Sequence, residues 1–420
     1  MTSDMPPTRR EVLTAVGLAA AFLSSLFLLT AALGAVGRTD LAVQYTGGWI
    51  VGHGDASRLY DLREQEIIER QLFRREHLLP YVHPPFQALL LAPLARLSPV
   101  KMYVLLGLIN VLLWLLFQHL LRPYTPVPRN PYRYILLCSL FPPLWIALVQ
   151  GQSTVLLLVL LSLTFACMKS GQDFLAGIFL GLGLYKFPIV LPFALICLLS
   201  RKWKLIGGVA AAASLWGVLS IIAVGPSGLR SYASLLFDIF KNPNDPAYWS
   251  MRVWDEMPTA RGFFTVLLAG RVPAICINAL LAAVSISLIL LAAWRWRQED
   301  GSGGEHSMGL MFAAALTISQ VTALHLYSHD LTLMLLAILL VIGSSQWLQR
   351  SGQRMILLAC LVILYAAPLY VLLLKWKAMY VLAAVLVAFA LAAISLARKA
   401  DLPPAQAIPA PLPAGGDGVN

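Results

Sequence analysis

The sequence predicts an all-α protein whose helices cross a membrane many times. Of the 420 residues, 59% are hydrophobic and 12% are charged, whereas soluble domains carry about twice that charged fraction. Apolar runs of about 18 or more residues recur to the end of the chain, and each is long enough to cross a bilayer as a helix. Because backbone polar groups need partners in lipid, helices are the expected form of each crossing. We therefore predict a polytopic helical bundle of about twelve spans.

The excess of basic residues predicts a membrane topology and no nucleic-acid partner. The formal net charge is +11, and lysines and arginines that flank membrane spans collect on the cytoplasmic side. Arg9 and Arg10 precede the first apolar run, so we expect the N-terminus in the cytoplasm and Thr39 outside. The partners that this composition predicts are membrane lipids.

The predicted organisation is one transmembrane domain with two long external loops. The C-terminal tail is rich in Pro, Ala and Gly and has no periodicity, so we expect it to be disordered. The predicted segments are a cytoplasmic N-terminus (1–11), the transmembrane domain (12–398) with external loops at 37–85 and 225–260, and the cytoplasmic tail (399–420).

The first external loop is the longest polar stretch, and it predicts two helices. Leu41, Tyr45 and Trp49 recur at helical spacing, and Asp61 with Glu64 resembles a capping pair that opens a second helix. Helices of this kind lie in the plane of the membrane interface. Paired prolines close the loop, because proline stops a helix that runs in from outside.

Two topologies remain open between the first loop and residue 204. In one, residues 86–97 cross alone and Lys186 lies within a single span, 174–199. In the other, residues 86–121 form one broken crossing, while 174–185 and 187–199 are two short crossings. The second topology puts more basic residues inside, so loop charge favours it.

Asp40 directly follows the first span and has two interpretations. It could be the N-cap of the following helix, which is a common position for aspartate. It could equally be a carboxylate at the membrane surface that accepts a proton from an attacking hydroxyl group.

Other polar residues interrupt the apolar runs. His325, Tyr327, His329 and Asp330 form a dense cluster, and such groups at membrane depth usually mark a site, although satisfied core or interface histidines are the alternative. Lys186 precedes the helix-breaking Pro188, so it either snorkels to the surface or meets a lipid phosphate. Two further candidates are Gln152, in a Gln-Gly-Gln break, and His83, which is either a ligand or packed beside the prolines.

The motifs of several nucleotide and metal enzymes are missing from the sequence. No P-loop, GxGxxG or HExxH pattern occurs, so neither a nucleotide-driven pump nor a membrane zinc protease is predicted. No residue group forms a clear metal cage, and we predict neither a metal nor another cofactor. An externally active transferase without a nucleotide-sugar domain would take its sugar from a lipid carrier.

Together, these motifs resemble glycosyltransferase family 87, the polyprenol-phosphate-mannose-dependent mannosyltransferases. The resemblance extends from about Asp40 to Leu340. The chain departs from the common pattern at His83, where members usually have Tyr, and at Ala323-Leu324, where they often have Ser-Pro. The matching stretches are Asp40-Leu41, Leu59-Tyr60-Asp61, YVHPPFQALLLAPL, GQSTVLLLVLL, AGIFLGLGLYKFP and HLYSHDLTLMLL.

The resemblance implies a GT-C fold and an inverting transfer on the external, periplasmic face of the plasma membrane. The donor would be a polyprenyl-phosphate sugar, with mannose as the hexose, and the acceptor a glycolipid or glycan. Asp40 would be the catalytic base, and Lys186 and His325 would stabilise the leaving phosphate. The implied substrate-binding residues are Lys186, Gln152, Tyr327, Asp330, His329, His83 and Tyr60.

Two other classes of function would use the same polar residues. A polytopic transporter or lipid flippase would place them along a path, but the long first loop and the lack of a detectable repeat argue against it. An O-antigen ligase or polymerase would be an external transferase that uses a pyrophosphate-linked glycan.

Overall fold

The computed structural model describes residues 8–75, 77–125, 130–241, 248–250, 253–300, 305–344 and 351–400. Every regular element in these ranges is helical, which confirms the all-α prediction. The predicted tail lies outside the described residues from position 401 onward. The α-helices are α1 (Arg9–Ala32), α2 (Leu41–Gly52), α3 (Leu62–Phe73), α4 (Pro85–Leu91), α5 (Pro99–Leu121), α6 (Pro131–Ser139), α7 (Pro142–Val149), α8 (Thr154–Lys169), α9 (Asp173–Leu182), α10 (Phe187–Leu199), α11 (Trp203–Lys241), α12 (Ala260–Leu268), α13 (Ala274–Asp300), α14 (Glu305–Val321), α15 (Met334–Gly343), α16 (Ser351–Tyr365), α17 (Ala367–Lys375) and α18 (Leu382–Ala400).

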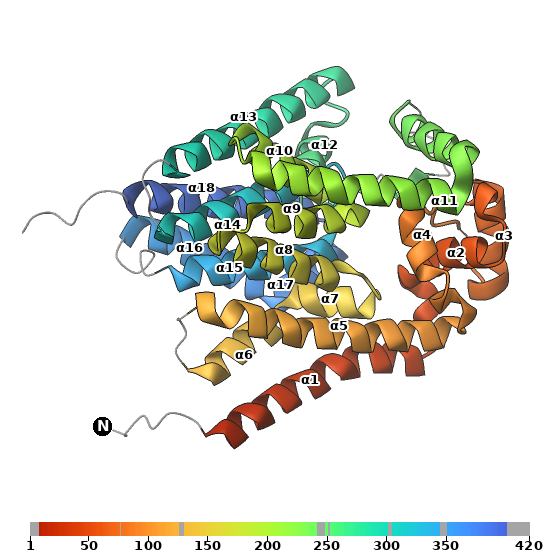
Figure 1. Cartoon of the computed structure of the whole chain (residues 1–420), viewed down its shortest axis with the longest axis horizontal. Coiled ribbons are helices and arrows are strands. Elements are labelled where there is room, and N and C mark those ends of the chain that lie inside the picture. Colours follow the sequence, from red (N-terminus) through yellow and green to blue (C-terminus); the bar gives the residue numbers. More distant parts are fainter. Residues whose placement is uncertain are drawn as a thin grey trace, which may run out of the picture.

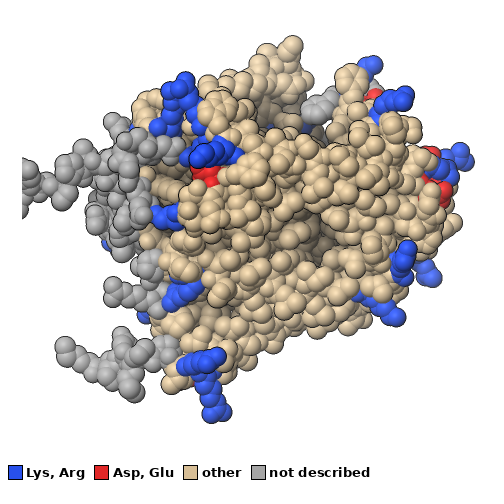
Figure 2. Space-filling model, in the orientation of Figure 1, with Lys and Arg blue, Asp and Glu red and all other residues tan. Residues whose placement is uncertain are grey.

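Several helices have the length and apolar composition of membrane spans. In the described part of the chain, six helices meet this requirement when α9 and α10 are counted together as Asp173–Leu199, or up to eight if two bent pairs each count as one span. The chain therefore has the helices of a multi-pass membrane protein. Figure 2 agrees, because on the face shown the lysines and arginines lie near the two ends and the middle is nearly free of charge.

The long helices lie side by side, and a separate group of short helices covers one end of the bundle. In Figure 1, α1 begins and α18 ends at the left, while α2, α3 and α4 gather at the right with the end of α11. We call α2, α3 and α4 the cap. Because Asp40 immediately precedes α2, it lies where the cap meets the bundle.

The cap helix α2 is buried on nearly all sides, so it differs from the predicted interface helix. The reason is its row of glycines, which lets neighbouring segments approach the backbone. A side chain on Gly47 would overlap the ring of Tyr81, and one on Gly48 would lie 3.0 Å from the backbone of Leu91 in α4. The second predicted helix is present as α3, and Asp61 caps it by accepting hydrogen bonds from the backbone N–H groups of Arg63 and Glu64.

Three predicted boundaries differ from the structure. The predicted broken crossing 86–121 divides into α4, which packs on α2 and α11, and α5, which alone has the length of a span. The predicted loop 225–260 begins with helix, since α11 turns at Gly225 (φ +67°) and continues to Lys241. One of the predicted spans near the C-terminal end forms instead the bent pair α16 and α17, which meet at 67°, and Pro368 there cannot donate a hydrogen bond to the preceding turn.

The helices α9 and α11 run in the same direction in close contact. A side chain on Gly177 would overlap the Leu205 carbonyl group, and one on Gly181 would overlap Ala212, so contacts advance together along both helices. Since α11 starts four residues after α10 ends, α10 must return across the bundle between them. This packing favours the second of the two open topologies for residues 174–199.

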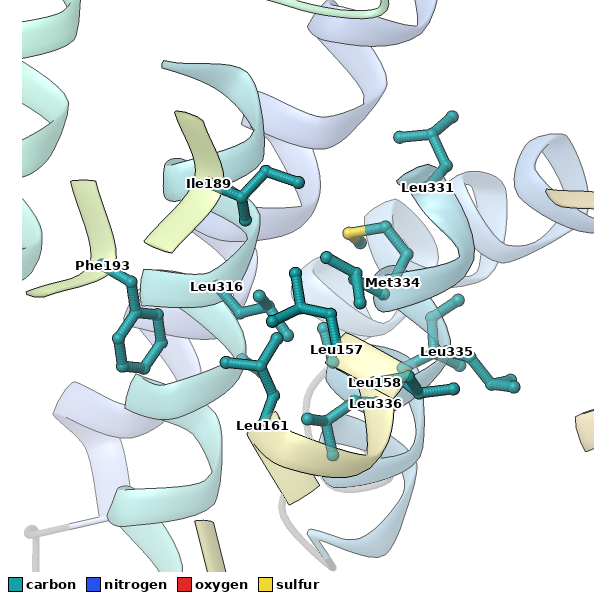
Figure 3. Close-up of a cluster of buried hydrophobic side chains, with 14 of the residues drawn as sticks. Leu157, Leu158, Leu161, Ile189, Phe193, Leu316, Leu331, Met334, Leu335 and Leu336 are labelled. Atoms are coloured by element: carbon teal, nitrogen blue, oxygen red, sulfur yellow. The ribbon is translucent and has the colours of Figure 1, made fainter. Parts of the chain in front are cut away.

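The core beneath the site is apolar and closely packed. Figure 3 shows Leu157 and Leu158 of α8 beside Leu335 and Leu336 of α15, with Leu316 of α14 nearby, and all of these are fully buried. Such packing fixes side chains in single rotamers. The core thus holds the start of α8 and the 3-10 helix η8 (Ser328–Leu333) in a fixed relation, and both contribute polar residues to the site.

Candidate functional site

Asp40 is held through its backbone, which leaves its carboxylate available. Arg75 donates hydrogen bonds to the carbonyl oxygens of Gly37 (2.7 Å) and Thr39 (3.2 Å), just before Asp40. The Asp40 N–H donates to Oε1 of Gln150 at 3.2 Å. Asp40 occupies the N-cap position of α2, but its side chain makes no capping hydrogen bond. The N-cap interpretation of this carboxylate is therefore wrong.

Gln152 connects Asp40 to the centre of the bundle. Its Nε2 donates to Oδ2 of Asp40 at 2.8 Å, and its Oε1 accepts from Nζ of Lys186 at 3.3 Å. The turn after α7 presents it there, because Gly151 adopts φ +66°, a conformation that side chains disfavour. Asn110 of α5 fixes this turn by donating to the Gln152 carbonyl oxygen at 2.9 Å.

Lys186 and Asp330 form a buried ion pair. Nζ of Lys186 lies 2.5 Å from Oδ1 of Asp330, and the two side chains are 9% and 8% exposed. The hydroxyl group of Thr154 donates to the same carboxylate oxygen at 3.0 Å. The snorkelling interpretation of Lys186 is thus wrong, since its ammonium group points to a buried partner. Burial of either charge alone would be costly, so each requires the other.

His329 closes a ring of polar contacts. Its Nε2 lies 3.3 Å from Oδ2 of Asp330, and its Nδ1 lies 3.7 Å from Oδ2 of Asp40. The contacts therefore run from Asp40 through Gln152, Lys186, Asp330 and His329 back to Asp40, and we call these five residues the polar ring. Four of the five are buried, whereas the Asp40 side chain is 33% exposed. Asp40 is the member of the ring that a substrate can reach.

His325 and Tyr327 lie beside the polar ring and outside it. Their rings make an edge contact, with centroids 4.7 Å apart, and the Tyr327 hydroxyl group donates to the Ser250 carbonyl oxygen. Burial lowers the pKa of His325 from its usual 6.5 to about 4, although the Asp330 carboxylate acts in the opposite direction. His325 is therefore neutral at pH 7, and it can donate a hydrogen bond but carries no charge.

His83 and Tyr60 lie in the segments that connect the cap helices, and they reach the site differently. Burial lowers the pKa of His83 to about 3, and the positive charge of Lys186 lowers it further, so His83 is a neutral neighbour of the polar ring. The Tyr60 hydroxyl group donates to the His83 carbonyl oxygen at 2.8 Å. Tyr60 thus fixes the backbone of His83, and its own ring packs beside Tyr81 and Tyr232.

Four residues at the site were missing from the sequence-based set. Gln150 and Thr154 flank Gln152 in the chain, and the predicted helix break could have indicated them. Arg75 had no distinguishing signal, since it follows α3 among other charged residues. The pKa of Glu256 is raised, first by burial, then by the negative charge of Asp255, and also by the negative charge of Asp40. Glu256 is therefore a neighbour of Asp40.

Among the described residues, no group of three or more His, Cys, Asp or Glu side chains has a geometry suited to a metal ion.

The geometry at Asp40 suits proton transfer. Oδ2 is used by Gln152 and faces His329, while Oδ1 accepts no hydrogen bond from any described residue. A carboxylate with one oxygen fixed and the other open can accept a proton from a hydroxyl group that approaches from outside.

The chain matches a known family over its central part. The model of glycosyltransferase family 87 matches residues 81–319, which is more than half of the chain. This range contains Gln152 and Lys186, whereas Asp40 precedes it and the His325–Asp330 segment follows it. No curated protein matches, and no solved structure matches.

The buried ion pair predicts a specific pattern of stabilities. Lys186→Met leaves the Asp330 carboxylate buried without its cation, so the free energy of unfolding should fall by about 3–5 kcal/mol. The double variant Lys186→Met/Asp330→Leu removes both charges and should recover much of that loss. Thermal unfolding of the detergent-solubilised protein measures both effects.

Lys101→Met provides the control, because Lys101 is exposed on α5 and its loss should change stability by less than about 0.5 kcal/mol. Equal destabilisation by the single and double variants would contradict a mutual dependence of the two buried charges.

Proposed function

Because the chain belongs to glycosyltransferase family 87, we propose that it transfers a hexose, mannose in the first instance, from a polyprenyl-phosphate carrier to a glycolipid or glycan. The transfer inverts the anomeric centre, and Asp40 is the general base. The observation that carries this proposal is the state of Asp40, whose carboxylate is partly exposed, caps no helix and has one open oxygen.

The proposed reaction is a single displacement. An acceptor hydroxyl oxygen attacks the anomeric carbon of the donor sugar while its proton moves to Oδ1 of Asp40. The new C–O glycosidic bond forms as the bond from the anomeric carbon to the phosphate oxygen breaks. The electron pair of the broken bond remains on the polyprenyl phosphate, which leaves with one more negative charge. The protein therefore has to orient Asp40 and stabilise the departing phosphate.

The polar ring supplies the first of these requirements. Gln152 fixes Oδ2 of Asp40 by a hydrogen bond and His329 lies beside the same oxygen at 3.7 Å, while Arg75 and Gln150 fix the backbone around it. A base held in one orientation loses little entropy when the acceptor arrives, which contributes to catalysis. Tyr327, His83 and His325 lie around the ring, where they would contact the sugar and its phosphate.

A lipid-linked donor agrees with the position of the site. Asp40 lies at the end of α1, which is a candidate span, and a polyprenyl chain in the bilayer would bring its phosphate to this depth. We further propose that the shorter apolar helices also cross, which gives about twelve crossings in a GT-C-type arrangement. The site then faces the external side of the plasma membrane, because the basic residues near the start of α1 stay inside.

The donor class is testable with the purified protein. We expect transfer of radiolabelled mannose from polyprenyl-phosphate mannose to membrane lipids, and we expect it to persist in EDTA because the site offers no set of metal ligands. GDP-mannose alone should give no product. Efficient transfer from the nucleotide sugar, or complete loss of transfer with the chelator, would contradict the proposed donor and mechanism.

The role of Asp40 is testable against a matched carboxylate in the same loop. Asp40→Asn retains the shape but accepts no proton, so transfer should fall by at least about 10²–10⁴-fold, the usual contribution of a general base. Asp61→Asn alters a helix cap whose contacts are to Arg58, Arg63 and Glu64 and include no member of the polar ring, and it should cost about 1 kcal/mol of stability. Initial rates at equal amounts of folded protein measure the difference.

Near-normal transfer by Asp40→Asn together with inactive Asp61→Asn would show that the base is the other carboxylate. Unfolding midpoints of both variants accompany the rates, so that a loss of folded protein is not taken for a loss of catalysis.

A further inference from the structure

The proposed reaction leaves a charge that the polar ring cannot neutralise. The departing polyprenyl phosphate gains negative charge in a low-dielectric site, where a nearby cation is worth far more than in water. Lys186 is the cation of the polar ring, but Asp330 lies 2.5 Å from its ammonium group. The pair is neutral as a whole, so it offers the phosphate little net charge.

His325 cannot supply that charge in its resting state either. Its side chain is partly buried, and the cationic groups near it, Lys186 and Arg261 among them, disfavour a further positive charge. A neutral imidazole donates one hydrogen bond from its N–H. A permanent cation is still required close to His325.

Arg261 is such a cation, and the structure holds it in place. It lies in the first turn of α12, where its guanidinium carbon is 4.5 Å from the ring centroid of Trp254. Its Nη1 donates to the carbonyl oxygen of Leu324 at 3.4 Å. Leu324 directly precedes His325 in the chain, so the guanidinium and the imidazole belong to one small region of the protein.

The charge of Arg261 lacks an internal partner. Within the ranges that the structure describes, no carboxylate lies at ion-pair distance from its guanidinium group. Guanidinium has five N–H donors, and the single bond to Leu324 leaves the others available. Arg261 is partly buried, and its unpaired guanidinium group can therefore bind an anion that arrives with the substrate.

The surroundings of Arg261 also suit an anion. Thr259 caps α12 by accepting a hydrogen bond from the Gly262 N–H at 3.1 Å, and the N-terminus of a helix carries partial positive charge. Stacking on Trp254 fixes the plane of the guanidinium group, which preserves its two-pronged geometry for phosphate oxygens. Lysine would not reproduce that geometry.

We propose that Arg261, together with the N–H of His325, binds the phosphate group of the polyprenyl-phosphate donor and stabilises it as it leaves. Lys186 then acts within the polar ring, where it holds Gln152 and Asp330 in position for Asp40. This inference rests on the proposed function, because it takes its ligand from that reaction.

Binding of the product carrier tests the proposal without any transfer. Native mass spectrometry or tryptophan fluorescence measures the affinity of the purified full chain for polyprenyl phosphate, for the corresponding polyprenol and for inorganic phosphate. The wild type should prefer polyprenyl phosphate to polyprenol. Arg261→Gln should weaken binding of polyprenyl phosphate by about 10- to 100-fold, the usual effect of a lost charge-assisted hydrogen bond, and should leave polyprenol binding unchanged.

Arg271→Gln is the matched control, because Arg271 follows the same helix and is exposed, and among the described residues its side chain donates to the nearby Leu267 carbonyl oxygen alone. It should retain the wild-type preference. If Arg261→Gln is recovered unfolded, Arg261→Met keeps the aliphatic packing against Trp254 and is measured in its place, with the same expectation.

The outcomes separate this inference from the proposed function. A wild-type preference for the phosphorylated lipid that persists in the Arg261 variant overturns the assignment of Arg261 and leaves the proposed donor intact. A wild type that does not distinguish polyprenyl phosphate from polyprenol contradicts the proposed donor itself. If inorganic phosphate binds with the same affinity as polyprenyl phosphate, the site recognises free phosphate. This result also overturns the inference.

Discussion

The ion pair between Lys186 and Asp330 is the interaction on which the rest of the site depends. Both side chains are more than nine-tenths buried, so neither charge is tolerable without the other. Asp330 also contacts His329 and Thr154, and Lys186 also contacts Gln152. Because His329 and Gln152 both reach Asp40, the buried pair determines the orientation of the one carboxylate in the ring that is open to a substrate.

The helical scaffold explains why these residues meet although they are distant in sequence. Each comes from a place where an apolar helix is interrupted: before α2, after α7, between α9 and α10, and in the 3-10 helix before α15. Such interruptions leave backbone groups that require partners, and they are tolerated in membrane proteins only where they are buried in protein or line a cavity. Because several helices are interrupted close to one another, their polar groups form one site and serve as hydrogen-bond partners for each other.

The sequence was most informative where local chemistry determines the structure. The helix cap at Asp61, the proline stop before α4 and the cluster from His325 to Asp330 all follow from short-range rules, although Glu64 pairs with Arg58 and does not complete the predicted capping pair. Tertiary packing was not predictable in this way. The glycines of α2 allow close packing, so the helix is buried where an interface helix was expected. The parallel packing of α9 on α11 was likewise not evident from the sequence. Nor does any local pattern reveal that Asp330 neutralises Lys186 or that Arg261 has no carboxylate partner among the described residues, because these depend on contacts between distant segments.

In the proposed reaction, Asp40 is the base, and it faces the anomeric carbon of the donor sugar from the side opposite the donor phosphate. A cryo-electron microscopy structure with a non-hydrolysable polyprenyl-phosphonate analogue of the donor measures this directly. Our account predicts the phosphonate on the far side of the sugar from Asp40, with room for one hydroxyl oxygen within about 3 Å of Oδ1. A phosphonate on the same side as Asp40, or an acceptor position that lies next to Glu256, would contradict it.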